Sequence, residues 1–340
     1  MHKSELLKEA LSIPNTIKSF TLIDNNPYQE IADLINKKKI KYVVTIARGT
    51  SDCAALYSSY LFAKYLGLPT YSLPPSIITL EKSKFDFSEA LSIVISQSGK
   101  SSDLIECEKK TREMGSKTLL ISNNVESPIA SKANYFFKMF AGEEKSVAAT
   151  KSFVQTLLVL IKLVFICQGR HKINEDIKNL SETLIADEKN QWSEKIIDKK
   201  INSGFILGRG VGFALSNEIS LKFKELCQEM IEPFSSAEVM HGPKSIIKDS
   251  FKLFILSMND KSGITVEKDS REITNYTKLN YKISSLDNSN TDFYYKSNEN
   301  NELDSIVIMA KFYPWITRYA IYKGLNPDKP RYLTKVTQTY

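Results

Sequence analysis

The residues best placed for chemistry follow the apolar run 93–95, which is typical of a buried strand. The turn after this run consists of Ser96, Gln97, Ser98 and Gly99. A helical pattern begins near position 101, with Ser101 or Ser102 as its N-cap and Asp103 in its first turn. Chemistry at this point would use hydroxyl groups and the backbone N–H groups of a glycine turn.

Such a turn predicts an anion site, because hydroxyls, N–H groups and the positive end of a helix dipole all favour negative charge. The sequence has no Walker-type Lys-Ser/Thr pair here, so a nucleoside triphosphate is not indicated. We expect a single phosphate on a small molecule. A serine-rich turn from strand to helix in any α/β protein is the alternative.

A second group of reactive side chains lies on a helix expected over 217–225. Glu218, Lys222 and Glu225 are spaced i, i+4 and i+7, so they share one face of that helix. The alternative is an ordinary exposed stripe of salt bridges. Sixteen residues after Glu225 comes His241, followed by a Gly-Pro turn that could hold its imidazole in place. His241 stands out because His2 is terminal and the third histidine lies in a polar connector.

The C-terminal segment differs from the frayed, polar end of most chains. It carries Pro330 and the apolar residues Tyr332, Leu333 and Val336, which predicts a tail docked on the body of the protein. A docked tail would place Lys335 in a pocket, whereas the alternative is a solvated terminal lysine. No spacing of His, Cys and Asp suggests a metal site, and we expect no cofactor.

Strand and helix patterns alternate along the first half, which predicts a parallel sheet with helices on both faces. The expected strands are 42–46, 91–95, 118–121 and 135–139, and the expected helices are 52–66, 103–114 and 152–167. The apolar stretch 153–166 contains Gln155 and Lys162 and is too short to span a membrane, so we interpret it as a buried helix.

The second half repeats landmarks of the first at an offset of 161 residues. Arg209-Gly210 corresponds to Arg48-Gly49, and Ser257 corresponds to Ser96. Two landmarks at one offset indicate an internal duplication. The second copy continues from Ser257 to Asp260 as Ser-Met-Asn-Asp, so only the first copy is expected to bind phosphate.

We therefore expect an α/β protein with two tandem flavodoxin-like domains, each a parallel sheet flanked by helices. The expected parts are an N-terminal helical segment (1–24), a first domain (25–168), a helical connector (169–202), a second domain (203–325) and a tail (326–340) that docks at the active site. A glycine pattern at 208–212 resembles a dinucleotide fingerprint, but Phe213 replaces its last small residue, so NAD is not expected.

Composition fits a globular protein of two domains, with 340 residues, 42% hydrophobic and 25% charged. The net charge is +7, yet basic and acidic residues are mixed along the chain, so neither nucleic acid nor a membrane is an expected partner. Four widely spaced cysteines and an N-terminus without a signal-peptide pattern indicate a cytoplasmic protein.

Six segments in order resemble the sugar isomerase (SIS) domain family over nearly the whole chain. They are Ala-Arg-Gly-Thr-Ser at 47–51, Ser-Gln-Ser-Gly-Lys-Ser at 96–101, the segment 142–153, Leu-Lys-Phe-Lys-Glu at 221–225, Met-His-Gly-Pro at 240–243 and Lys-Pro-Arg-Tyr-Leu-Thr-Lys at 329–335. The chain is similar to the isomerase half of glucosamine-6-phosphate synthases and most similar in pattern to stand-alone glucosamine-6-phosphate deaminases of the second type.

The resemblance implies the residues that bind the substrate. Those matching the family's phosphate site are Ser96, Gln97, Ser98 and Ser101, and those matching its sugar-lining loops are Thr50, Ser51, Val147 and Ala149. Ser101 keeps the hydroxyl of the threonine found in the synthases. Ala149 replaces a serine, so one hydroxyl contact with the sugar is in doubt.

The resemblance also implies catalytic roles. Glu225 matches the base that moves a proton between carbons 1 and 2, and His241 matches a ring-opening residue contributed by the partner subunit of a homodimer. Lys222 and Lys335 match two active-site lysines, of which the tail lysine forms an imine with the open ketose in the synthases. These roles suit aldose–ketose interconversion, which needs a base and positive charge near the developing enediolate.

The synthases begin with a glutaminase domain that carries a nucleophilic cysteine, whereas this sequence begins Met1-His2. The resemblance therefore points to the reverse reaction, glucosamine 6-phosphate plus water giving fructose 6-phosphate plus ammonia. Galactosamine 6-phosphate, a fructosamine-6-phosphate adduct cleaved to glucose 6-phosphate, and another phosphosugar isomerisation remain alternatives. A sugar-phosphate sensor without catalysis is the alternative from another class, although such sensors usually have one domain fused to a DNA-binding segment.

Overall fold

The computed structural model describes residues 4–20, 25–187, 192, 195, 197–286 and 291–335, so His2 and Val336 lie outside the described residues. The chain divides into two compact units. The first-sheet unit contains residues 15–144, residues 151–181 and the tail from Leu333, and the second-sheet unit contains the chain up to Pro14, Lys145–Thr150 and Glu182–Tyr332. Each unit has one five-stranded sheet, which confirms the expected α/β class with two tandem domains.

The first sheet is parallel throughout, in the order β2-β1-β3-β4-β5 of flavodoxin-like folds. Its strands are β1 (Tyr42–Ile46), β2 (Thr70–Ser72), β3 (Ala90–Ile95), β4 (Lys117–Ser122) and β5 (Tyr135–Lys138). The four strands expected from the sequence are confirmed to within a residue at each end. The expectation missed β2, because three polar residues at a sheet edge carry no period that distinguishes them from a loop.

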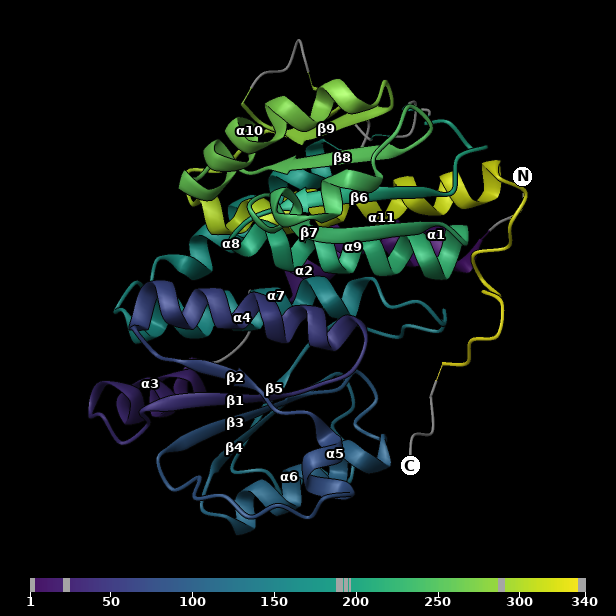
Figure 1. Cartoon of the computed structure of the whole chain (residues 1–340). Helices are drawn as coiled ribbons and strands as arrows, with labels where there is room; N and C mark the ends of the chain where they lie inside the picture. The colour runs from purple at the N-terminus through teal and green to yellow at the C-terminus, as the bar shows by residue number, and fades with distance from the viewer. Residues whose placement is uncertain are drawn as a thin grey trace. The chain divides into compact units, whose positions relative to one another are not determined.

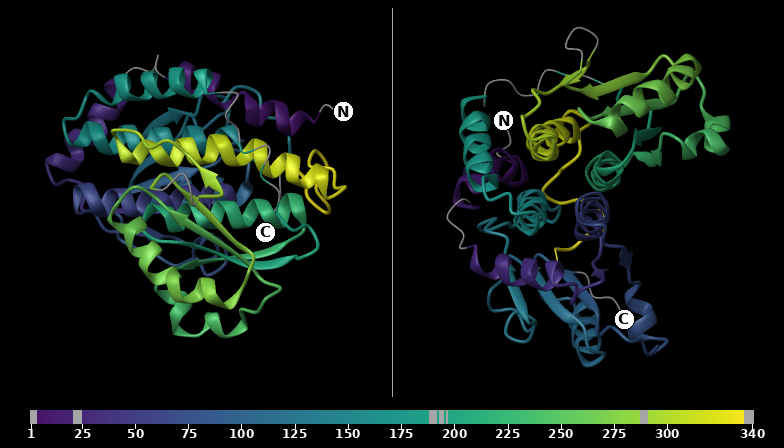
Figure 2. Two further views of the ribbon diagram at one scale, coloured as in Figure 1. Left: turned by 90° about the horizontal axis from the view of Figure 1, so that it is seen from above. Right: turned by 90° about the vertical axis from the view of Figure 1, so that its left-hand side faces the viewer.

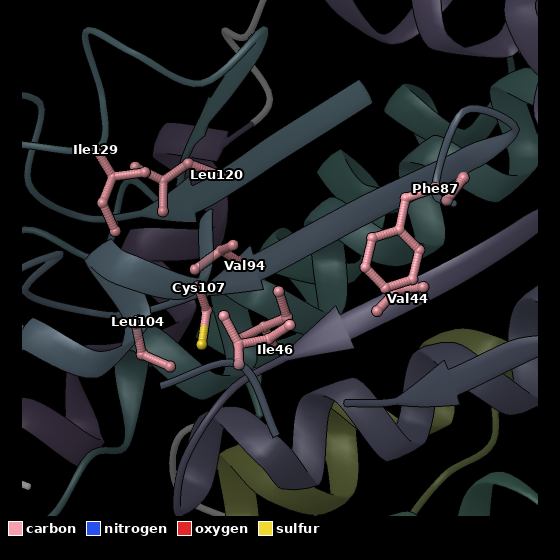
Figure 3. Packing of buried hydrophobic residues seen from close by; sticks show 10 residues of the cluster. Val44, Ile46, Phe87, Val94, Leu104, Cys107, Leu120 and Ile129 are labelled. Atoms are coloured by element: carbon pink, nitrogen blue, oxygen red, sulfur yellow. The ribbon is translucent and has the colours of Figure 1, made fainter. Parts of the chain in front are cut away.

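Helices cover both faces of this sheet, with α4 and α7 on one side and α5 and α6 on the other (Figure 1). The helices of this unit are α2 (Ile13–Phe20), α3 (Asn26–Asn36), α4 (Thr50–Leu66), α5 (Pro75–Thr79), α6 (Ser102–Glu113) and α7 (Lys151–Cys167). Figure 3 shows Ile46, Val94 and Cys107 meeting in the core between the sheet and α6. Every residue of β3 is buried, as expected when a parallel sheet is covered on both faces.

The helix α7 is buried along its whole length, which confirms the interpretation of the apolar stretch 153–166. It packs against α3 and α4, and α4 and α7 are seen side by side and end-on in the right-hand view of Figure 2. The charge of Lys162 rests over the ring of Tyr28, 4.8 Å from its centroid. None of the helices that the structure describes is long and apolar enough to cross a bilayer.

The second sheet is also parallel, in the order β10-β9-β8-β6-β7. Its strands are β6 (Ser203–Gly208), β7 (Met230–Ser235), β8 (Lys252–Ser257), β9 (Asn280–Ser284) and β10 (Phe293–Tyr294). The helices with it are α1 (Glu5–Leu11), α9 (Val211–Cys227), α10 (Lys261–Ile273) and α11 (Asp304–Tyr322), and α8 (Ile173–Ala186) connects the units. Leu253 and Ile255 of β8 pack on the α10 side, whereas the ring of Phe254 packs against that of Phe223 of α9.

The internal duplication is confirmed by the strand order, which is the same in both sheets when β6 is matched to β1. The helices α4 and α9 are each 17 residues long and follow glycines with nearly the same positive φ, 55° at Gly49 and 59° at Gly210. Both helices end in a left-handed residue, Gly67 and Gln228. The offset of 161 therefore holds through a whole strand–turn–helix.

The tail is attached differently from the expectation. Tyr332 is 87% exposed and Leu333 is 42% exposed, so the prediction that these two side chains dock is wrong. The attachment instead uses Asp328, whose carboxylate accepts hydrogen bonds from the Ser4 hydroxyl at 2.9 Å and from the backbone N–H of Leu6 at 2.8 Å. A carboxylate at this point caps the first turn of α1.

Candidate active site

In the first-sheet unit, the expected phosphate loop lies where the strand order reverses, at the carboxyl ends of the neighbouring strands β1 and β3. Arg48 follows β1, and its Nε and Nη2 atoms each lie 3.1 Å from Oδ2 of Asp103, which is 5% exposed in the first turn of α6. This ion pair ties the two loops together. Thr50 and Ser51 therefore open α4 beside the turn that contains the serines.

The turn itself is held by a dense set of hydrogen bonds. The Ser96 hydroxyl accepts the N–H of Gly99 at 3.1 Å, and Asn124 donates its side-chain amide to the carbonyl of Ser98 at 3.0 Å. Gly99 has φ of 62°, and an added Cβ would collide with the side chain of Ser127. Ser96 is buried, whereas Gln97, Ser98 and Ser101 are half-buried and accessible to a ligand.

The start of α6 differs from the start of the corresponding helix in the second copy. Ser101, one of the two expected N-cap residues, is the N-cap, and its hydroxyl makes no capping hydrogen bond. In the second-sheet unit, the N-cap of α10 is Asp260, whose Oδ1 accepts the N–H of Gly263 at 2.7 Å. The second copy therefore caps this helix end with its own carboxylate, whereas the N-cap side chain of the first copy makes no such bond.

We expect Asp260→Ala to lower the free energy of unfolding by about 1 kcal/mol, because an N-cap side chain is lost. The measurement is the urea midpoint of the variant against the unmodified protein. Asp260→Asn keeps a capping oxygen and should recover most of the loss. Equal destabilisation by both substitutions would show that the cap is not the cause.

The expected catalytic stripe on α9 is buried, so the alternative of an exposed salt-bridged face is wrong. Lys222 and Glu218 are fully buried, and the Glu225 side chain is 20% exposed. The Nζ atom of Lys222 lies 2.7 Å from Glu225 Oε2 and 3.2 Å from Glu218 Oε1. The hydroxyl of Tyr313, from α11, donates to Glu218 Oε1 at 2.8 Å. One carboxylate of a buried ionic cluster thus reaches the surface.

Burial raises the pKa of Glu218 to about 7, against the opposing effect of Lys222. Burial acts to lower the pKa of Lys222, but the two carboxylates outweigh it and the pKa of Lys222 is raised. Lys222 therefore stays a cation at every physiological pH. Near neutrality Glu218 takes up or releases a proton beside Lys222, and Glu225 is the partly exposed member of the cluster.

The raised pKa of Glu218 makes stability depend on pH in a predictable direction. The folded state holds a proton between pH 4.5 and about 7 where the unfolded chain does not, so stability falls as the pH rises through this range. Glu218→Gln removes this titration. We expect the melting temperature of the variant, relative to the unmodified protein, to rise between about pH 5 and pH 8. A difference that is independent of pH would contradict the assignment.

The loop that contains Val147 and Ala149 belongs to the second-sheet unit. Both residues are half-buried. The carboxylate of Glu9, buried in α1, accepts the backbone N–H groups of Lys145 and Ser146 and fixes the start of this loop. The loop that the family uses to line the sugar is therefore held by the N-terminal helix.

Lys335 and His241 occupy different surroundings. The Nζ atom of Lys335 lies 3.4 Å from Oε2 of Glu144, a residue of the first-sheet unit. His241 ends a 3₁₀ turn (Glu238–His241), is exposed, and has no hydrogen-bond partner within the part of the chain that the structure describes. The structure thus brings together the phosphate-loop residues, pairs Lys222 with Glu225, and leaves His241 on the surface. That His241 enters the active site of a partner subunit in a homodimer stays a prediction.

The described residues contain no cluster of three or more His, Cys, Asp or Glu side chains arranged to hold a metal ion. Sequence reasoning missed three residues that support the site: Glu9, Glu144 and Tyr313. Glu144 lies inside the quoted segment 142–153 and could have been found there, as a carboxylate just before a helix. Glu9 and Tyr313 act from helices distant in sequence, and no local pattern marks them.

Comparison with known proteins decides the family. Residues 34–166 match the family model of the SIS domain. The chain is a SIS-domain protein. The matched region covers β1 to α7 and therefore the expected phosphate loop.

Relatives of this SIS-domain protein include glutamine–fructose-6-phosphate aminotransferases (isomerizing). That of Sulfolobus acidocaldarius is 32% identical over an alignment of 319 positions, which covers 89% of this chain and 52% of the relative. That of Fusobacterium nucleatum is 29% identical over 97% of this chain and 57% of its own length. The chain spans about half the length of the curated relatives it matches.

Solved structures share the whole fold. A protein of Silicibacter pomeroyi DSS-3, assigned as a phosphosugar isomerase, superposes with a TM-score of 0.85 at 29% identity, covering 96% of this chain and all of that one. A glucosamine-6-phosphate deaminase of Thermotoga maritima gives a TM-score of 0.77 at 23% identity, covering 99% of this chain and all of that one. The second likeness establishes the fold alone.

Proposed function

We propose that this SIS-domain protein interconverts the aldose and ketose forms of a hexose phosphate. The observation that carries the proposal is the carboxylate of Glu225, partly exposed and 2.7 Å from the buried ammonium of Lys222. A carboxylate in this position can take a proton from a sugar carbon and return it to the neighbouring carbon. The adjacent cation favours the negative charge that develops on the enediolate oxygen.

Each further residue has a part in this proposal. The hydroxyls and N–H groups of the turn at 96–101 bind the phosphate and fix the sugar at one end. Thr50, Ser51, Val147 and Ala149 line the sugar. His241 opens the ring by moving the proton of the anomeric hydroxyl. Lys335 bonds to carbon 2 of the open ketose as an imine, with loss of water.

The finer proposal is that the substrate is glucosamine 6-phosphate and the product fructose 6-phosphate. Glu225 moves the proton of carbon 2 to carbon 1 of the open aldose, and a proton passes from the nitrogen to the oxygen on carbon 1, so that the amine at carbon 2 becomes an imine. Water then adds at carbon 2 and ammonia leaves. The resemblance of the six sequence segments to the second-type deaminases supports this direction, and isomerisation and deamination share the same proton transfer.

The test is ammonia release from purified protein given glucosamine 6-phosphate, with galactosamine 6-phosphate and fructosamine 6-phosphate in parallel. Release from the first substrate, with fructose 6-phosphate formed, is the expected result. Turnover of one of the other two substrates would support the proposed isomerase activity but would contradict glucosamine 6-phosphate as the substrate. No turnover of any substrate, while a sugar phosphate still raises the melting temperature, would overturn catalysis and favour a sensor.

A further inference from the structure

Glu144 is a buried carboxylate between β5 and the first turn of α7. Its Oε1 atom accepts the backbone N–H of Ser152 at 3.2 Å, and its Oε2 atom accepts the Ser152 hydroxyl at 2.7 Å. The same Oε2 atom lies 3.4 Å from the Nζ atom of Lys335. The Glu144 side chain is fully buried, whereas that of Lys335 is 27% exposed.

These contacts assign different parts to the two residues. A buried carboxylate is costly unless hydrogen bonds and a counter-charge satisfy it. Ser152 and the positive end of α7 supply part of that stabilisation and fix the orientation of the carboxylate on a rigid helix. Lys335 supplies the counter-charge from a tail whose preceding residues, 331–334, are exposed. The rigid partner is therefore Glu144, and the partner that is positioned is Lys335.

The position of Glu144 in the chain connects this contact to the sugar loop. Residues 145–150 follow it directly and contain Val147 and Ala149. The side-chain amine of Lys151, the first residue of α7, donates to the carbonyl of Glu143 at 2.6 Å and closes the other end of this loop. Glu144 thus directly precedes the sugar loop in the chain and contacts both the start of α7 and the tail lysine.

We propose that Glu144 is a positioning residue that holds the ammonium of Lys335 at the start of the sugar loop, so that the tail lysine is ordered before the substrate binds. The catalytic consequence rests on the proposed function, since it assigns Lys335 to the open ketose. The contact between the Glu144 carboxylate and the Lys335 ammonium, which we call the tether, exists in the protein without substrate and can be measured separately.

The first experiment measures the rate of reductive methylation of Lys335 by mass spectrometry, without substrate. Glu144→Gln keeps an oxygen for Ser152 but removes the charge that holds Lys335. We expect labelling of Lys335 to rise roughly tenfold, the factor for one lost hydrogen bond to a charged group. The exposed Lys329 of the same tail is the internal control and should label equally in both proteins.

A matched variant distinguishes loss of the contact between Glu144 and Lys335 from a general destabilisation of the loop. Glu9→Gln changes another buried carboxylate that accepts backbone N–H groups at the same loop, but Glu9 belongs to the second-sheet unit, whereas Lys335 belongs to the first-sheet unit. Lys335 labelling should stay unchanged in Glu9→Gln. Equal labelling of Lys335 in the unmodified protein and in Glu144→Gln would overturn the proposal, as would an equal rise in both variants. If Glu144→Gln fails to fold, Glu144→Asp, which keeps the charge on a shorter side chain, should give an intermediate rate.

The kinetic experiment is a double-mutant cycle on the preferred sugar phosphate. Glu144→Gln should lower kcat with little change in KM, and adding it to Lys335→Met should cause no further loss, because Glu144 acts through Lys335. Additive losses would overturn the positioning role in catalysis. If Glu144 controls labelling while the unmodified protein turns over no sugar phosphate, the tether stands and the proposed function fails.

Discussion

Glu225→Gln should abolish most of the turnover while leaving the protein folded. Glutamine has the size of glutamate and keeps an oxygen for Lys222, but it cannot accept a proton from a sugar carbon. Loss of a positioned general base costs about 10²- to 10⁴-fold in rate. We expect a loss of kcat in this range with KM nearly unchanged, measured by ketose formation in steady-state kinetics on the preferred sugar phosphate.

Folding of the variant is expected because the buried ammonium of Lys222 keeps a second carboxylate, Glu218, at 3.2 Å. The matched control is Glu232→Gln in the same unit, where a surface glutamate pairs with Lys224 at 2.9 Å. Such exposed pairs contribute little, so this variant should keep full activity and an unchanged melting temperature. Unchanged turnover in Glu225→Gln would contradict the proposed isomerase mechanism, even if a sugar phosphate still binds to the protein.

The sequence was sufficient to predict the α/β class because central strands such as β3 are continuous apolar runs with both faces covered. Repetition was visible because the Arg-Gly turns before α4 and α9 need the same positive φ at Gly49 and Gly210. The phosphate loop stays a prediction, made from its composition and from its place between a strand and a helix.

The burial of the α9 stripe was not predictable from spacing, because spacing places Glu218 and Lys222 on one face without showing what covers that face. Tyr313 of α11, almost a hundred residues away in the chain, contacts Glu218 and helps to cover this face of α9. The docking predicted for Tyr332 and Leu333 was wrong for a related reason. The apolar character of Tyr332 and Leu333 suggested docking, but the anchor is the capping carboxylate of Asp328, which depends on a helix end brought from the other terminus.

Gly99→Ala should abolish phosphate binding through two separate effects. A residue with a Cβ at φ of 62° costs about 1–2 kcal/mol in the left-handed region. The added Cβ would also lie only 2.6 Å from the hydroxyl of Ser127, a contact that forces the turn to move. Because the Ser96 hydroxyl and the Gly99 N–H are joined in this turn, a shift at position 99 displaces the phosphate ligands together. The expected result is loss of the rise in melting temperature that a sugar phosphate gives the unmodified protein.

Gly142→Ala separates the two effects, because Gly142 has nearly the same φ, 66°, with no atom within 4 Å of an added Cβ. This variant should be destabilised by the backbone cost alone and still respond to the sugar phosphate. In the double variant Gly99→Ala/Ser127→Gly the colliding side chain is gone, so part of the ligand response should return. If Gly99→Ala binds the sugar phosphate as the unmodified protein does, the turn at 96–101 is not the phosphate site. If the double variant recovers nothing, the backbone conformation at position 99, and not the collision with Ser127, controls the binding geometry.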